Sequence, residues 1–231
     1  MDIEALFDLF RSDVVDEAAP NLWTDTEVWE YMDDAQKEFC RRTWGIADSR
    51  SALTELDVEE NDDWVEISSR ILRIRGARRA SDGRKLSVIS FEQLERMRAA
   101  DDDYGQPIMP VIDDTTTGPL QWLITGMDQH ALRLSPIAAE DDTIRLTVDR
   151  LPATIDADEV AAGLQLEIAD KYHRTLLLWM KHRAYSKQDA ETFDKGKAAE
   201  FGALFAAACE TARVERERLE QPQGPIAYGG I

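Results

Sequence analysis

The sequence contains few of the residues on which metal centres and disulfide-rich scaffolds depend, with 2 cysteines and 3 histidines among 231 residues. Cys40 and Cys209 both lie in apolar stretches with helical spacing, so buried thiols explain them better than a disulfide framework. No apolar run reaches the roughly 18 to 20 residues of a membrane span, and the N-terminus lacks a basic flank. We therefore expect no membrane partner and synthesis in the cytoplasm.

The sequence also lacks the common motifs that place a nucleophile, a zinc ion or a nucleotide: G-x-S-x-G, H-E-x-x-H, a phosphate loop and G-x-G-x-x-G. His173 and His182 would lie about 180° apart around a helix at 100° per residue, so they cannot hold one metal ion together. Asp170 and His173 have the spacing of a helix-surface pair, and a small hydrolase that uses them is the less favoured alternative. The sequence predicts a protein that is not an enzyme and has no cofactor or metal.

Cations are scarce, because 27 Lys and Arg stand against 46 Asp and Glu, for a formal net charge of -19. Such an excess of negative charge repels nucleic acid and anionic membranes unless the few cations are gathered in one place. A protein that grips DNA is therefore disfavoured. An acidic regulator that mimics DNA, and binds a basic protein as a monomer, is an alternative from another class.

The N-terminal part of the chain has the apolar spacing of two helices. The first runs from Asp2, a suitable N-cap, to about Val14. The second begins at a capping box formed by Thr24 and Glu27 and stops at Gly45. Both helices place their apolar residues on one face, which predicts that they pack against other helices.

The middle of the chain, from Ala52 to Ile155, consists of alternating or β-rich segments separated by Asp, Gly and Pro. A weaker capping box at Ser90 opens a short helix to about Ala99. Helical spacing returns beyond Asp156, and the last helix, Lys195 to Glu220, would be about 39 Å long at 1.5 Å per residue. The fold class predicted from this order is α+β and mainly α, a helical bundle with a β-rich insertion and an extended C-terminal tail. The expected domains are the bundle helices 1–50, the β-rich insertion 51–156, the bundle helices 157–220 and the tail 221–231.

Two hairpins are expected within the β-rich segment. Residues 131–135 and 143–149 form the first, in which Ile144, Leu146 and Val148 point to one face. The second turns at Ser81, Asp82 and Gly83.

A group of cations flanks this second turn, with only one acidic residue among them. The net charge of this segment is about +6, whereas that of the rest of the chain is about -25. One interpretation is a solvated outer face of the hairpin. Another is a contact in which the basic strand of one copy meets an acidic surface of the next, the geometry that builds a closed ring. Direct phosphate binding comes third, because the overall field opposes it. The residues of this candidate basic strand are Arg70, Arg73, Arg75, Arg78, Arg79, Arg84 and Lys85.

Four blocks of the sequence resemble the head-to-tail adaptor proteins of tailed bacteriophages. The most specific is LLLWMKHRAYSKQDAETFDKGKAAEF, residues 176–201, and the AYGG of residues 227–230 follows it. The N-terminal residues 8–46 and the central ILRIRGARRASDGRKL, residues 71–86, are also similar to this family. The resemblance therefore spans nearly the whole chain.

The resemblance implies a structural virion protein of the neck between capsid and tail. Such an adaptor forms a ring of twelve copies that joins the portal protein to the tail nozzle or tail tube, and genomic DNA passes through it without sequence-specific contact. An acidic lumen would keep the DNA backbone from adhering. Another neck or tail-completion component with a similar fold is the nearest alternative.

The C-terminal segment of such adaptors engages the portal. In this sequence it combines apolar side chains suited to pockets with glycines that permit close backbone approach. The candidate portal-docking residues are Pro225, Ile226, Ala227, Tyr228, Gly229, Gly230 and Ile231.

Overall fold

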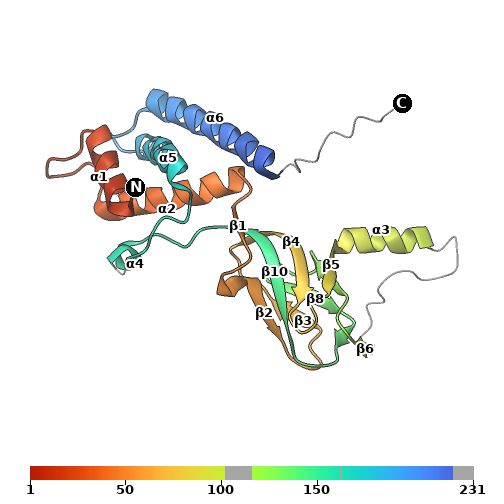
Figure 1. Ribbon diagram of the computed structural model, residues 1–231. Coiled ribbons are helices and arrows are strands. Elements are labelled where there is room, and N and C mark those ends of the chain that lie inside the picture. Colours follow the sequence, from red (N-terminus) through yellow and green to blue (C-terminus); the bar gives the residue numbers. More distant parts are fainter. Residues whose placement is uncertain (102–115, 162, 221–231) are drawn as a thin grey trace, which may run out of the picture. The chain divides into compact units, whose positions relative to one another are not determined.

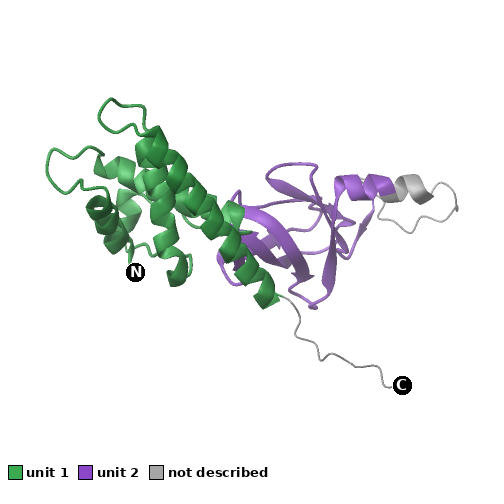
Figure 2. Cartoon of the chain, turned by 90° about the horizontal axis from the view of Figure 1, so that it is seen from above, with its two compact units in different colours: residues 1–45, 152–231 green, residues 46–151 purple. Residues whose placement is uncertain are grey.

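The computed structural model describes residues 1–101, 116–161 and 163–220 of the chain (Figure 1). Two units divide it. Residues Met1–Gly45 and Pro152–Ile231 make up unit 1, and residues Ile46–Leu151 make up unit 2 (Figure 2). The chain therefore leaves unit 1 once, builds unit 2 from one continuous segment, and returns.

The expectation of a mainly α fold with a β insertion is wrong. Helices hold 43% of the residues and strands 24%, and the strands form a large curled sheet, a half-barrel of eight strands. Several of these strands are only three or four residues long, so each gives a weak local signal. Joined by pairing between distant segments, they enclose a core of their own, and the fold is α+β.

Unit 1 is built from α1 (Ile3–Asp13), α2 (Asp25–Arg42), α4 (Ala157–Ala161), α5 (His173–Ser186) and α6 (Lys195–Glu220), with a 3-10 turn at Asp170–Tyr172. Helix α5 packs against α1, α2 and α6, so residues from both ends of the chain share one core. The largest core side chains include Ile3, Leu6, Phe10, Trp23, Met32, Leu176, Met180 and Phe205.

The expected helix starts in the N-terminal part are confirmed. The Asp2 carboxylate accepts a hydrogen bond from the Ala5 amide at 2.7 Å. Thr24 accepts one from the Glu27 amide at 3.3 Å, and the Glu27 carboxylate accepts one from the Thr24 amide at 2.9 Å. Each of these bonds satisfies an amide that has no partner inside its own helix.

Helix α2 ends where the sequence predicts, and α6 caps this end. Trp44 and Gly45 both have positive φ, and the Gly45 amide bonds back to the Cys40 carbonyl at 2.6 Å. The Arg216 guanidinium donates to the Thr43 carbonyl at 3.1 Å and also to the Gly45 carbonyl. A cation at this position also interacts favourably with the C-terminal end of the α2 dipole.

Unit 2 has eight paired strands in one sheet, ordered β1-β10-β4-β5-β7-β8-β3, with β2 paired to β10 as well. A 3-10 turn at Ala52–Thr54 precedes β2, and β6 (Thr117–Gly118) pairs with β9 (Ile137–Ala138) outside this sheet. The eight strands are β1 (Ile46–Asp48), β2 (Glu55–Val58), β3 (Trp64–Glu66), β4 (Ile71–Arg79), β5 (Lys85–Ser90), β7 (Trp122–Thr125), β8 (Ala131–Ser135) and β10 (Asp142–Arg150).

The core of unit 2 comes from alternate residues of these strands. In β10, Ile144, Leu146 and Val148 are buried, whereas Arg145 and Thr147 are exposed, as the alternation predicts. Leu86 of β5, Leu123 of β7 and Leu134 of β8 belong to the same buried cluster.

The expected hairpin of residues 131–135 with 143–149 is wrong. Strand β8 pairs with β3 and β7, while β10 pairs with β1, β2 and β4. The short β9 lies between them in the chain and pairs with β6, which diverts the connection. Alternation identifies the buried face of a strand, but it does not identify the strand's partner.

The second expected hairpin is confirmed. Strands β4 and β5 pair antiparallel, with Ala77 opposite Leu86 and Arg78 opposite Lys85. Gly83 in the turn has φ +71, a conformation that glycine adopts without steric cost. This hairpin places the cations on either side of the turn next to one another.

Helix α3 (Phe91–Asp101) follows β5 directly, and the Ser90 hydroxyl accepts a hydrogen bond from the Gln93 amide at 3.1 Å, as the capping pattern predicts. Its Leu94 packs on Ile89 and Ile124 of the parallel pair β5 and β7. A parallel pair needs a long crossover connection, and α3 is part of this one.

Replacing Thr24 with alanine tests the capping box. We expect Thr24→Ala to lower the free energy of unfolding by about 1 kcal/mol, because an N-terminal amide of α2 loses its acceptor. Thr26→Ala is the matched control, since Thr26 lies on the exposed first turn of the same helix. Urea unfolding of both variants provides the measurement, and equal losses would show that the box is not the cause.

Candidate interaction surfaces

The predicted basic residues lie along β4 and the start of β5 and fall into two groups. Arg73, Arg78, Arg84 and Lys85 are exposed. Arg70, Arg75 and Arg79 make contacts within unit 2: Arg70 donates to the Leu151 carbonyl at 3.1 Å, and Arg75 lies 3.7 Å from the Asp149 carboxylate. The sequence gives no sign of this division, because Leu151, Asp149 and Asp142, which bind these cations, are more than 50 positions away in the chain.

Arg79 is the clearest case of an internal role. Its side chain is 7% exposed, and it donates to Asp142 at 2.7 Å and to Glu140 at 3.0 Å. These hydrogen bonds, that with Asp142 foremost, keep the pKa of Arg79 above its ordinary value. Arg79 joins the end of β4 to the start of β10 and is not available for a partner.

Asp142 accepts several hydrogen bonds at this junction. Burial alone would raise the pKa of its carboxyl group, but bonds from Arg79, Ser81 and Thr143 outweigh burial and hold the pKa below its ordinary value. The carboxylate is therefore ionised in the folded chain at neutral pH. An ionised buried carboxylate requires its counter-ion, which is Arg79.

A further exposed cation beside these strands, Arg145, was not among the residues predicted from the sequence. Arg145 of β10 lies directly opposite Arg78, and Arg78 lies directly opposite Lys85 of β5. Alternation in β10 already places Arg145 on the polar face. That Arg145 lies opposite Arg78 could not be predicted without knowing that β10 pairs with β4.

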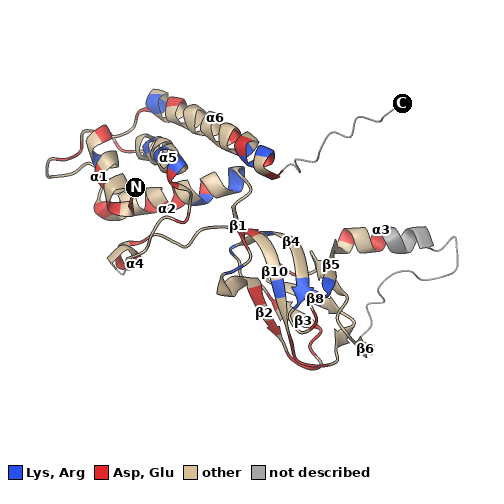
Figure 3. Cartoon of the chain, in the orientation of Figure 1, with Lys and Arg blue, Asp and Glu red and all other residues tan. Residues whose placement is uncertain are grey.

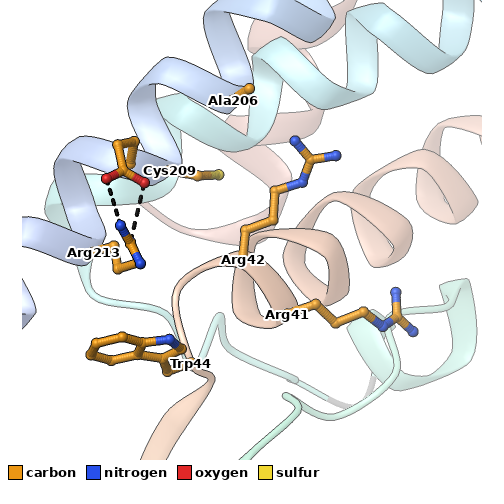
Figure 4. Close-up of a pocket in the computed structure, with 7 residues that line it drawn as sticks. Arg41, Arg42, Trp44, Ala206, Cys209 and Arg213 are labelled. Carbon is orange, nitrogen blue, oxygen red and sulfur yellow. Dashed lines mark hydrogen bonds and ion pairs between the residues drawn. The ribbon is translucent and has the colours of Figure 1, made fainter.

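A groove in unit 1 also carries cations. It encloses about 380 Å³ and is lined by Arg41, Arg42, Trp44, Ala206, Cys209, Glu210 and Arg213 (Figure 4). Arg213 forms a double hydrogen bond with Glu210, at 2.7 and 3.1 Å, and its guanidinium lies 5.8 Å from the Trp44 ring centre. Arg42 bonds Glu38 at 2.7 Å and lies over the Trp179 ring. These guanidinium groups already have partners, so the groove is no open anion site.

Cys209 in this groove is not a reactive thiol. Burial raises its pKa to about 12, so the thiolate needed for nucleophilic attack is absent at neutral pH. Cys40 is also a buried thiol outside any disulfide, as expected for both cysteines. The cysteines therefore contribute to packing.

Two of the three histidines, His173 and His182, make structural contacts. The ring of His173 is 2% exposed and shares a hydrogen bond with the Ile168 carbonyl at 2.7 Å, while Asp170, at 3.6 Å, has a side chain that is 86% exposed. His182 bonds the Ala198 carbonyl at 2.8 Å. Across the described residues, no group of three or more His, Cys, Asp or Glu side chains is placed to hold a metal ion.

The candidate portal-docking residues 225–231 lie outside the described part of the chain. Among the residues described, no helix has the length and hydrophobicity needed to span a membrane.

The sequence model of the SU10 adaptor protein family matches residues 1–227, nearly the whole length of the chain. The chain belongs to this family of phage adaptor proteins. The resemblance to tailed-phage head-to-tail adaptors is thereby confirmed. No curated protein matches the chain.

Membership of this family gives the chain a structural adaptor role in the virion neck, with components of the portal or tail as its partners. It favours a structural over a catalytic role, in agreement with the contacts of His173 and Cys209. The candidate surfaces are therefore evaluated as contacts between proteins.

Replacing Arg79 tests its internal role. We expect Arg79→Ala to lower the free energy of unfolding by about 3 kcal/mol, because it leaves the buried Asp142 carboxylate without its main counter-ion. Arg78→Ala, which removes an exposed cation from the neighbouring position, should change stability by less than about 0.5 kcal/mol. Urea unfolding of both variants is the measurement, and equal losses would contradict the assignment.

The same cluster predicts a dependence on pH. Since the folded pKa of Asp142 lies below its ordinary value of 3.8, its contribution is present above that value and is lost as the pH falls through the folded pKa. Between about pH 7 and about pH 3, Asp142→Asn should therefore lose less stability than the unchanged chain. An unchanged difference between the two pH values would contradict this cause.

Proposed function

We propose that this chain forms the adaptor ring that joins the portal to the tail of its phage and surrounds the DNA channel. The observation that carries the proposal is the family match over residues 1–227. A ring of twelve copies would match a dodecameric portal. Nozzle or tail-tube subunits bind its other side in this proposal.

The net charge of the chain supports the proposal that DNA passes through the ring. With a net charge of -19, each copy repels a phosphate backbone in general, so a channel wall built from such copies would let DNA slide without adhering. The exposed cations of unit 2 are already included in this net charge, and Figure 3 shows acidic residues on both units.

The tail is proposed to hold the portal. Residues 221–231 follow directly after α6, a helix of 26 residues that could act as a strut. Ile226 and Tyr228, two positions apart, would fill pockets on one face of an extended strand, and Ile231 would add a further apolar anchor.

Electron microscopy of the chain mixed with its portal ring tests this function. We expect a symmetric added layer with the full chain and none after deletion of residues 221–231. A second variant, Ile226→Ser with Tyr228→Ser and Ile231→Ser, keeps the tail length and should also lose the layer, because its apolar anchors are gone.

Comparing the full and truncated chains distinguishes the docking role of the tail from the adaptor role of the chain. A layer of unchanged occupancy on the truncated chain would contradict the docking role of the tail but not the adaptor role. If no layer forms with any variant, the portal assignment fails.

A further inference from the structure

Four charged residues form a row across four neighbouring strands of unit 2. Glu55 of β2 lies opposite Arg145 of β10, Arg145 lies opposite Arg78 of β4, and Arg78 lies opposite Lys85 of β5. All four are exposed. Directly paired residues on neighbouring strands have their side chains on the same face, with Cβ atoms about 5 Å apart.

The row is unfavourable for an isolated chain, because like charges placed directly opposite each other destabilise a sheet. Arg145 has a counter-ion, Glu55, at 3.5 Å. Arg78 donates only to the Gly83 carbonyl, at 3.2 Å, and no ion pair of Arg78, Arg84 or Lys85 occurs within the described part of the chain. We call Arg78, Arg84, Lys85 and Arg145 the basic patch.

An acidic surface lies on the same sheet, at strand β2 and the turns next to it. Strand β2 has β10 as its one paired partner among the described strands. Asp57, Glu59, Glu60 and Asp141 are exposed on this strand and the adjoining turns, and none has an ion pair within the described residues. We call these four residues the acidic edge. Figure 3 shows red on β2 and blue on β10 and β4.

The cations at the β4–β5 turn are too far from β2 for its carboxylates to neutralise them fully. Lys85 lies three strand spacings from β2, about 14 Å at roughly 4.8 Å each, while the screening length at physiological salt is about 8 Å. Arg145 is the patch residue next to β2, and Glu55 is its counter-ion.

We propose that the basic patch of one copy binds the acidic edge of the next copy, so that the copies associate head to tail. A contact between two different surfaces of the same chain is heterologous, and repetition with a fixed rotation closes it into a ring. This inference rests on the proposed ring and names the surfaces that join its copies. Of the seven residues predicted from the sequence it keeps Arg78, Arg84 and Lys85, and it adds Arg145.

A second copy fits the basic patch better than DNA does. The patch borders an acidic edge on the same sheet, which would repel a duplex lying across the face, and the whole chain is acidic. Another copy presents a short acidic strand and turn, whose charge is opposite to that of the patch.

Charge-reversal variants test the contact. The patch variant carries Arg84→Glu with Lys85→Glu, and the edge variant carries Glu59→Lys with Glu60→Lys; none of these four side chains makes a hydrogen bond or ion pair within the described residues. The control variant, Arg174→Glu with Lys195→Glu, reverses two exposed cations of unit 1. Circular dichroism should be the same for all of them.

Sedimentation of the full-length chain without portal, from micromolar to about 1 mM and at low and high salt, measures the association. We expect the unchanged and control chains to form species larger than two copies, more so at low salt. The patch and edge variants alone should associate at least tenfold more weakly, because like charges then face each other.

The mixture of the two variants is the decisive sample. The reversed patch of one then faces the reversed edge of the other, and the remaining contacts also join opposite signs, so an equimolar mixture should associate as the unchanged chain does. Failure of the mixture to recover association overturns the proposal. So does a monomeric unchanged chain, or a species that stops at two copies.

Binding to duplex DNA is measured in parallel by gel shift. DNA binding that the patch variant loses, with self-association unaltered, would assign the patch to nucleic acid and overturn the inference. Neither the sedimentation assay nor the gel shift contains portal protein. A negative result for self-association therefore does not affect the portal assignment, and a negative portal assay does not affect the conclusion on self-association.

Discussion

Strand β10 is the element on which unit 2 depends, because it pairs with other strands along both of its edges. It holds β1 and β2 on one side and β4 on the other. Its inward residues supply the middle of the core, and Asp142 at its start binds Arg79 at the end of β4. The same arrangement places the acidic strand β2 on one side of β10 and the cations of β4 and β5 on the other. One pairing pattern thus sets both the packing of the sheet and the segregation of its charge.

Local signals in the sequence predict the features that short segments determine. Thr24 with Glu27 predicts the start of α2, Gly83 predicts the turn between β4 and β5, and Ser90 predicts the start of α3. A cap or a turn involves residues a few positions apart, so propensity and hydrogen-bonding capacity suffice.

Features that depend on distant pairing could not be predicted in this way. The sequence pattern predicted that β8 pairs with β10, because the two strands are close in the chain. In the sheet, other strands lie between them. The pattern grouped Arg79 with the exposed cations because Asp142 and Glu140 are about 60 positions away. It also missed Arg145 as part of the basic patch, although alternation had placed that residue on the outer face. The prediction of a mainly α fold was wrong for the same reason. Each short strand gives a weak local signal, and the size of the sheet becomes evident only when distant strands are paired.

In the proposed ring, the basic patch of one copy of the chain binds the acidic edge of the next. Zero-length cross-linking of amines to carboxylates tests it most directly, on assemblies made from an equal mixture of ¹⁴N- and ¹⁵N-labelled chains. The account predicts mixed-label peptides in which Lys85 of one copy is joined to Glu59, Glu60 or Asp57 of another. Cross-links of Lys85 that occur only within one copy, or only to a different protein, would contradict it.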